Sequence, residues 1–307
     1  MAMDKNGFWR DSFALKGSVI TQVFPLILTF GLISAVICVL DWVVERALDV
    51  QIGLEVAPHE IAGAALGLML ILRTNAGYDR WWEARKLWGG IVNQSRSLVI
   101  SALSYGPTDP EWRDNIVRWT SVFPHIARCS LRGQKPNPEV VDLVGQVHYD
   151  AIANSQHMPS YVIYKIATLL MEGRQRFQLD PFSFQQIDKE RALLIDHVGA
   201  CERILKTPLP LVYSIKIRRF IMLFLVTLPF ALLHKMDFEM LIPLITMLVA
   251  YPLISLDQIG VELQNPFSGS NLNHLPLRNI VDTIQANLAG LQKAQEDEAT
   301  LLAKSPR

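Results

Sequence analysis

The chain has few cysteines and no surplus of charge of either sign. Its 307 residues include three cysteines, 29 Lys and Arg, and 29 Asp and Glu. Cys38, Cys129 and Cys201 are far apart in the sequence and form no CxxC pair, so neither a disulfide framework nor a zinc site is predicted, and the thiols are interpreted as buried. The basic residues are dispersed and mixed with acidic ones, which argues against nucleic acid as a partner.

Motifs of the common enzyme classes are also absent from the sequence. It contains no HExxH, no GxSxG, no P-loop and no GxGxxG after a predicted strand. The histidines are scattered, and we interpret His125 and His148 as structural residues of a helical domain in preference to metal ligands. We therefore predict no enzymatic activity, no cofactor and no bound metal.

Long apolar segments are present instead. Half of the residues are hydrophobic and the mean hydropathy is +0.22, which is more apolar than an average soluble domain. Val19–Leu40 carries no charge and is long enough to cross about 30 Å of hydrocarbon. It is longer than a signal-peptide core and has no A-x-A-like cleavage site, so we predict a retained transmembrane helix. Shorter apolar runs follow at Ile61–Leu72, Phe220–Leu233 and Met240–Ser255.

The residues between the second and third apolar runs are typical of a water-exposed helical domain. Thr108-Asp109-Pro110-Glu111 fits a capping box with proline in the first turn, and Asn137-Pro138 and Asp180-Pro181 fit an N-cap followed by proline. No run of alternating apolar and polar residues indicates a sheet. The predicted fold class is therefore all-α, an integral membrane protein with a large cytosolic helical domain.

The basic residues predict how the apolar helices are oriented. Lys and Arg precede the first run, follow the second and precede the third, whereas the linker 41–60 is acidic. Because basic loops stay in the cytoplasm, we predict four transmembrane helices in the inner (plasma) membrane with both termini cytoplasmic. The predicted segments are a cytosolic N-terminal segment 1–18, transmembrane helices 1 and 2 in 19–72, the cytosolic domain 73–219, transmembrane helices 3 and 4 in 220–255, and a cytosolic C-terminal segment 256–307 with an amphipathic helix over Ile280–Leu291.

A stripe of residues along the second apolar run has the spacing of a pore lining. Glu60, Ala64, Leu68 and Leu72 follow one another in steps of four, so they share one helix face. In a symmetric pore this face supplies an outer ring of carboxylates, which favours cations, and apolar rings, which gate by dewetting. The spacing alone leaves two plainer interpretations open. Glu60 suits a helix N-terminus, and the small residues of the run suit helix packing.

The segment Arg73–Gly89, R-T-N-A-G-Y-D-R-W-W-E-A-R-K-L-W-G, resembles the bacterial branch of the bestrophin family. Weaker matches follow in the family's order at Asp180-Pro181-Phe182, at Pro210-Leu211-Val212-Tyr213 and at Asn265-Pro266-Phe267. Read without the family, the tryptophan pair with its arginines is explained by an aromatic belt at a membrane interface. The signature and interface residues that the resemblance assigns are Arg73, Asn75, Tyr78, Arg80, Trp81, Trp82, Glu83 and Arg85.

This resemblance implies a homopentameric ion channel of the chloride-channel family, helical throughout, with one pore on the five-fold axis. Matched through the tryptophan pair, the family's pore neck falls on Ala64, Leu68 and Leu72 of a pore-lining helix over 61–72, and its cytosolic aperture falls on Phe182. Ala64 is small where family members are usually bulky, so a wider outer neck is expected. The implied partners are monovalent ions, membrane lipid and further copies of the same chain.

Calcium dependence is predicted from positions where this chain departs from the family's sequence pattern, and ion selectivity is predicted from the placement of its charged residues. Calcium-activated animal members carry an acidic run after Asn-Pro-Phe, where this chain has Ser270-Asn271-Leu272-Asn273. Useful calcium affinity needs several carboxylates, so we predict calcium-independent current. Glu60 and the acidic linker favour monovalent cations, whereas the basic cytosolic domain and the animal relatives favour anions; we prefer cations. The alternative function is a membrane-anchored helical scaffold or signalling protein that does not conduct.

Overall fold

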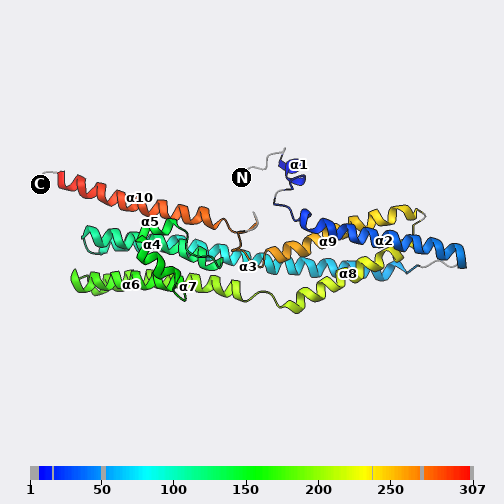
Figure 1. The fold of residues 1–307 in the computed structure, drawn as a ribbon, viewed down its shortest axis with the longest axis horizontal. Helices are drawn as coiled ribbons and strands as arrows, with labels where there is room; N and C mark the ends of the chain where they lie inside the picture. The colour runs from blue at the N-terminus through cyan, green and yellow to red at the C-terminus, as the bar shows by residue number, and fades with distance from the viewer. Residues whose placement is uncertain (1–6, 16, 50–52, 237, 270–272, 305–307) are drawn as a thin grey trace. The chain divides into compact units, whose positions relative to one another are not determined.

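The structure is a computed structural model that describes residues 7–15, 17–49, 53–236, 238–269 and 273–304, and every regular element among them is a helix (Figure 1). This confirms the predicted all-α fold class. The helices are α1 (Gly7–Ser12), α2 (Ile20–Leu48), α3 (Val56–Tyr105), α4 (Pro110–Leu131), α5 (Glu139–Ala153), α6 (Met158–Arg176), α7 (Pro181–Lys206), α8 (Leu211–Leu233), the 3-10 helix η1 (Glu239–Leu241), α9 (Ile242–Glu262) and α10 (Leu277–Lys304).

The chain forms two compact units. Unit 1 comprises residues 1–81 and 208–266, and unit 2 comprises residues 82–207 and 267–307. The boundary divides the tryptophan pair, since Trp81 belongs to unit 1 and Trp82 to unit 2. The bestrophin-like signature segment therefore contributes residues to both units. The predicted assignment of segments to membrane and cytoplasm stays a prediction.

The helices of unit 1 extend beyond the apolar runs that predicted them. α2 continues to Leu48, and α3 begins at Val56, so the connection is shorter than the predicted linker 41–60. Residues 41–48 contain neither Gly nor Pro and place Arg46 in the last turn, where a cation suits the helix dipole. Asp49 ends α2 in the left-handed conformation (φ 55°), which Asp tolerates better than most residues.

Unit 1 has an apolar core formed by α2, α3, α8 and α9. Its buried members come from all four helices and include Val23, Ile27, Leu66, Leu70, Ile221, Phe224, Ala250 and Ile254. Among the described residues, three helices are long and apolar enough to cross a membrane: α2, α3 and the stretch Glu239–Glu262. α8 is not one of them, because Lys216, Arg218 and Arg219 interrupt it and its charge-free part is shorter than a span requires.

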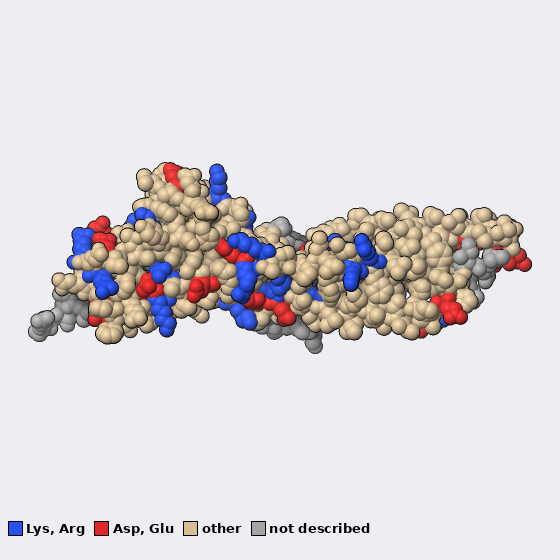
Figure 2. Space-filling model, turned by 90° about the horizontal axis from the view of Figure 1, so that it is seen from below, with Lys and Arg blue, Asp and Glu red and all other residues tan. Residues whose placement is uncertain are grey.

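The outer surface of unit 1 is also apolar. Figure 2 shows that Lys, Arg, Asp and Glu are sparse over the unit 1 surface visible in that view. Large apolar side chains stand exposed along α2, among them Phe24, Leu28, Leu32, Val36 and Val39. Soluble monomers rarely expose a contiguous apolar surface of this kind. Together with the apolar helices, this surface is that of a membrane protein.

Unit 2 is a helical bundle with α4 at its centre. α4 packs against α5, α6, α7 and α10, and every residue from Trp119 to Cys129 is buried. The hydroxyl groups of Thr120 and Ser121 on this helix donate to backbone carbonyls one turn earlier. The Trp112 indole donates to the carbonyl of Leu169 at 2.7 Å.

The predicted helix caps have mixed outcomes. Asp180 caps α7 as predicted, accepting from the backbone N–H groups of Phe182 and Ser183. The box beginning at Thr108 is wrong by one residue, because Asp109 is the N-cap of α4 and accepts from the N–H of Trp112 at 2.8 Å. The prediction of Asn137 is also wrong. Pro138 occupies the N-cap position of α5, while the Asn137 side chain accepts from the Cys129 thiol at 3.6 Å.

Candidate functional site

The predicted stripe lies on a face of α3 that the rest of the chain leaves exposed. Leu68 and Leu72 are 59% and 55% exposed, and Glu60 and Ala64 are exposed as well. Steps of four residues keep these side chains in line along the helix. The stripe is therefore a continuous face with a carboxylate at its start and apolar side chains beyond it.

The exposed faces of α3 and α2 differ in composition. From Phe24 to Val43 the exposed residues of α2 are mostly bulky and apolar, as expected for contact with lipid tails. The exposed face of α3 combines bulky residues such as Ile61 with the small Ala64 and Ala65, and it has Glu60 near its start and Asn75 and Asp79 farther along. Polar and ionisable residues within membrane segments usually face other helices or water rather than lipid. The face of α3 is thus suited to a protein-lined or water-lined surface.

A buried ion pair lies behind the exposed face of α3. Arg73 is fully buried, and its guanidinium group is paired with the carboxylate of Asp257 on α9. Arg218 of α8 donates through Nε to the same carboxylate at 2.9 Å. Gly260 permits the approach, since a Cβ there would lie 3.2 Å from Nε of Arg73. Two guanidinium groups share one carboxylate, so the triad of Arg73, Asp257 and Arg218 carries a net positive charge.

The sequence analysis did not identify Asp257 or Arg218 as members of this site. Asp257 lies two residues beyond the fourth apolar run and was treated as part of a soluble segment. A signal was nevertheless present, because a lone carboxylate at the end of an apolar helix requires a partner if it is buried. Which of the basic residues supplies that partner depends on tertiary packing over 184 residues of chain.

Signature residues of unit 1 occupy both faces of α3. The rings of Tyr78 and Trp81 stack with centroids 6.2 Å apart. Arg80 donates to the backbone carbonyl of Gln264 at 3.4 Å, just past the end of α9. Asn75 is exposed, on the same side of the helix as the stripe. Arg73 and Arg80 therefore tie α3 to α9 and the chain that follows it, while Asn75 belongs to the exposed face.

The remaining signature residues belong to unit 2. Glu83 accepts from Arg203 of α7 at 3.1 Å. Trp82 and Arg85 are exposed. Large exposed aromatic rings of this kind are enriched among the anchor residues of protein–protein interfaces. The signature is thus a set of structural contacts and exposed side chains and does not form one pocket.

Phe182, the predicted cytosolic aperture, lies at the start of α7 in unit 2. It is 82% exposed and lines an open depression of about 560 Å³ with Tyr105, Gln186 and Lys189 among others. The capping of α7 by Asp180 fixes the backbone from which the ring projects. Burial of a phenylalanine is worth about 1.5–3 kcal/mol, and the exposed ring leaves this free energy unused within the single chain.

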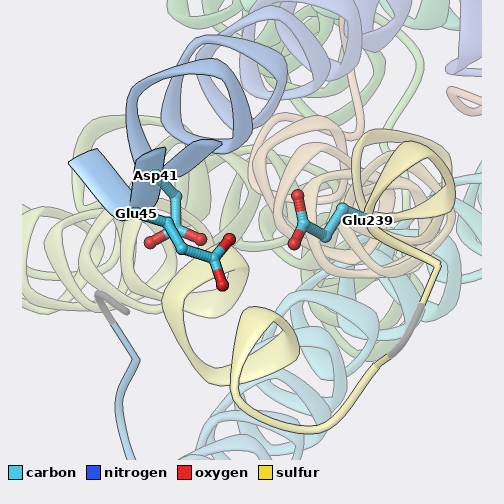
Figure 3. A group of neighbouring side chains, drawn as sticks. All are labelled: Asp41, Glu45 and Glu239. Atoms are coloured by element: carbon cyan, nitrogen blue, oxygen red, sulfur yellow. The ribbon is translucent and has the colours of Figure 1, made fainter. Parts of the chain in front are cut away.

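A cluster of carboxylates lies elsewhere in unit 1. Asp41 and Glu45 of α2 and Glu239 of η1 bring their side chains together, with one oxygen of each within 4.8 Å of the others (Figure 3). The sequence placed the first two in an acidic segment but gave no indication of Glu239. Acidic groups of this kind are common without an ion, and we assign none here. The cluster gathers three carboxylates near the end of α2, where Arg46 also lies.

The calcium prediction concerns residues that lie mostly outside the described part of the chain. Ser270, Asn271 and Leu272 are not described, and Asn273 is exposed. The preceding Phe267 is buried, and its carbonyl accepts from Arg132 at 3.0 Å. Calcium independence therefore stays a prediction.

Comparison with known proteins identifies the family. Residues 1–290 match the family described as "Bacterial/Fungal Bestrophin protein". The chain belongs to the bestrophin family. It is 33% identical to the voltage-dependent anion channel-forming protein YneE of Escherichia coli K12, over 96% of this chain and 93% of that protein. It is 30% identical to the voltage-dependent anion channel-forming protein alr2987 of Nostoc, over 95% and 94%.

The fold agrees with this assignment. The crystal structure of a bacterial bestrophin homolog from Klebsiella pneumoniae superposes with a TM-score of 0.80 at 27% sequence identity, covering 88% of this bestrophin and 98% of that chain. The predicted resemblance is confirmed. Family, relatives and apolar helices together indicate a membrane protein that functions in ion transport as a channel.

Proposed function

We propose that this bestrophin assembles as a homopentamer around a single pore that conducts small monovalent ions across the inner membrane. Each subunit crosses four times, through α2, α3, α8 and α9, with both termini in the cytoplasm. α8 is included because its Phe224 and Leu228 pack in the same core as α2, α3 and α9. Inside a bundle α8 needs less contact with lipid than a helix that crosses alone. This placement accounts for the basic residues before α2 and in the first half of α8, and for the acidic residues at the end of α2 and in its connection to α3.

The observation that supports the pore most directly is the exposed stripe on α3. In a ring of five copies, Leu68 and Leu72 form two successive apolar constrictions, and Ala64 leaves the outer part of the neck wider. Apolar rings of this kind control conduction by dewetting. Phe182 forms a second aperture on the cytosolic side, which agrees with its exposure in the single chain.

The selectivity proposal rests on Glu60. Five carboxylates at the outer mouth concentrate cations and repel anions, so the pore favours monovalent cations. The two relatives quoted above have names that specify anions. The preference for cations is therefore the part of this proposal that the next experiment tests most directly. Current is proposed to be independent of calcium, since Ser270-Asn271-Leu272-Asn273 supplies no carboxylate.

The decisive experiment is a reversal potential in planar bilayers under a potassium chloride gradient. We expect a cation-signed potential for the purified protein and a weaker one for Glu60→Gln. Glu55→Gln is the matched control, because Glu55 is also exposed but precedes α3 and lies outside the stripe. An anion-signed potential overturns the selectivity proposal and leaves the channel. Micromolar calcium added to the cytosolic side is expected to leave the current unchanged.

Two further outcomes concern the assembly. The mass of the detergent-extracted complex is expected near five times 34.6 kDa. A monomer or dimer contradicts the pentamer and favours a scaffold. Absence of current from the natural protein and also from the double variant Leu68→Ala/Leu72→Ala, whose neck is widened, contradicts the channel.

A further inference from the structure

A groove opens on unit 1 between α2, α8 and α9. Its volume is about 470 Å³, within the range of ligand-binding pockets. Six apolar side chains form most of its wall: Val23, Leu26, Phe30, Ile221, Met222 and Ile254. The groove is therefore suited to hydrocarbon along most of its length.

The polar lining residues gather at one end of this groove. Gln22 lies at the start of α2, Arg218 in the first half of α8, and Asp257 and Gln258 near the end of α9. Hydrogen bonds bring these helix ends together: Gln258 donates to Gln22 at 2.6 Å, and Arg218 donates to Asp257 at 2.9 Å. The apolar lining continues from there for eight residues of α2, roughly 12 Å, to Phe30.

Arg218 supplies the positive charge of the polar end. Its bond to Asp257 uses one of the five N–H donors of a guanidinium group, and its side chain is 56% exposed. Asp257 is already paired with Arg73, so the triad keeps a net positive charge. The amide groups of Gln22 and Gln258 bond to each other, and Gln22 also donates to Glu262 at 3.2 Å. Arg218 is thus the group in the lining that is suited to an anion.

A cation at the mouth of an apolar groove matches a molecule with an oxyanion head and a hydrocarbon tail. Arginine binds phosphate oxygens with paired N–H donors. A free phosphate ion would meet only the half-exposed Arg218, where an ion pair is worth little, and would leave the apolar wall uncovered. Basic pockets between transmembrane helices on the cytoplasmic side bind anionic lipid head groups. The combination of charge and shape therefore favours a membrane lipid.

We propose that this groove binds an anionic phospholipid of the cytoplasmic leaflet, with the phosphate on Arg218 and one acyl chain between α2 and α8. This inference rests on the membrane arrangement proposed above, in which the start of α2 lies at the cytoplasmic interface. The net positive charge of the triad selects lipids with a net negative head group over zwitterionic ones. The lipid fills the groove beside the ion pair that holds α3 to α9.

Native mass spectrometry of the purified assembly, titrated with phosphatidylglycerol, tests the site. Arg218→Gln is expected to weaken binding at least about tenfold, the loss of one charge-assisted bidentate contact. Its folding is protected because Arg73 still pairs with Asp257. The matched control is Arg219→Gln, which removes the same charge from the adjacent, exposed position outside the groove lining and is expected to change affinity less than about twofold.

A second variant tests the apolar part without altering charge. Leu26→Trp fills the groove and is expected to abolish binding of phosphatidylglycerol while Arg218 is intact. Phosphatidylcholine and glycerol phosphate are the comparison ligands, and both are expected to bind more weakly. Equal affinity for phosphatidylcholine overturns the selection for negative head groups, and tight binding of glycerol phosphate overturns the acyl-chain contact. Unchanged affinity in both Arg218→Gln and Leu26→Trp overturns the site.

The outcome is separable from that of the proposed channel. Reversal potentials measured on the same preparations report conduction, whereas the titration reports lipid. Current without the Arg218-dependent lipid means that the lipid site fails and the channel stands. Lipid bound through Arg218 without current means that the lipid site stands and the channel proposal fails.

Discussion

From Trp119 to Cys129, α4 of unit 2 has no exposed side chain, while α3 in unit 1 buries Leu66 and Leu70 on one face and leaves Leu68 and Leu72 bare on the other. Both helices are rich in apolar residues, so composition does not explain the difference. Unit 2 surrounds its central helix with α5, α6, α7 and α10 from the same chain. Unit 1 has too few helices to enclose α3. In the proposed pentamer, lipid and other copies of the protein cover this apolar surface.

The two units also treat buried polar groups differently. In unit 2 the buried hydroxyl groups of Thr120 and Ser121 bond to the backbone of α4 itself, and Nε of the buried Arg128 has no hydrogen-bond partner among the described residues. In unit 1 the buried polar groups include an ion pair, Arg73 with Asp257, which joins two helices. Removing one member of a buried ion pair costs free energy of folding, because the other charge is then buried without a partner. We therefore expect the stability of unit 1 to be sensitive to the loss of either member of this pair.

The largest effect that separates the units is expected from Asp257→Asn. The change leaves Arg73 buried without a counter-charge and is expected to destabilise the fold by about 3–5 kcal/mol. Arg218→Gln is the matched control, since its half-exposed side chain leaves the Arg73 pair intact and is expected to cost less than about 1 kcal/mol. Thermal unfolding in detergent measures both. Equal melting temperatures for the natural protein and Asp257→Asn would show that the pair does not hold α3.

The sequence made the fold class and the stripe on α3 predictable because both depend on local periodicity. A charge-free run as long as Val19–Leu40 has few alternatives to a membrane helix, and the spacing of Glu60 to Leu72 is a property of the helix itself. The buried partner of Arg73 was not predictable in this way. Hydropathy assigns Asp257 to a soluble segment, and only the packing of α9 against α3 makes it a buried partner.

Helix boundaries were less predictable because charge was interpreted as the end of a helix. The apolar run ends at Leu72, yet α3 continues to Tyr105. The segment that follows Leu72 contains no proline, and its Arg, Lys and Glu residues are good helix formers. The same reasoning shortened α2, which passes through Asp41 and Glu45 to Leu48. At α4, Thr108 and Asp109 are both acceptable caps, and the backbone before Pro110 selects Asp109. Hydropathy indicates where an apolar membrane segment ends, whereas the helix propensity of the residues determines where the helix ends.

A pair of alanine substitutions tests the comparison between α4 and α3 directly. Ile126→Ala removes a fully buried side chain from α4 and is expected to cost about 2–5 kcal/mol. Leu68→Ala removes an exposed side chain and is expected to leave the stability of the single subunit almost unchanged while raising the single-channel current through a wider neck. Leu66→Ala, on the buried face of the same helix, serves as the control and should resemble Ile126→Ala. Melting temperature and bilayer current are both recorded. A large loss of stability with Leu68→Ala alone, at unchanged current, would place this residue in a core and not in a pore.

The smallest expected effect concerns pH and the interior of unit 2. Burial lowers the pKa of His125 below its ordinary value of 6.5, and this outweighs the hydrogen bond to Gln285, which acts in the opposite direction. Of the nearby charges, Arg128 opposes protonation, whereas Glu139 and Asp282 favour it. With Nε2 donating to Gln285, the other ring nitrogen is buried without a hydrogen-bond partner, so a proton added there would lack an acceptor.

The sign of the pH effect follows from this geometry. Below pH 6.5 the unfolded chain binds a proton at His125 that the folded chain resists, so stability is full above that pH and is lost as the pH falls toward the lowered pKa of the folded state. The melting temperature in detergent is expected to drop between pH 7.5 and 5.5, and His125→Gln should reduce the drop because glutamine does not titrate. Burial lowers the pKa of His148 and His197 in the same direction, so part of the drop should persist. If His125→Gln preserves the whole drop, protonation of this buried ring does not limit the stability of unit 2, and its comparison with the buried ion pair of unit 1 fails.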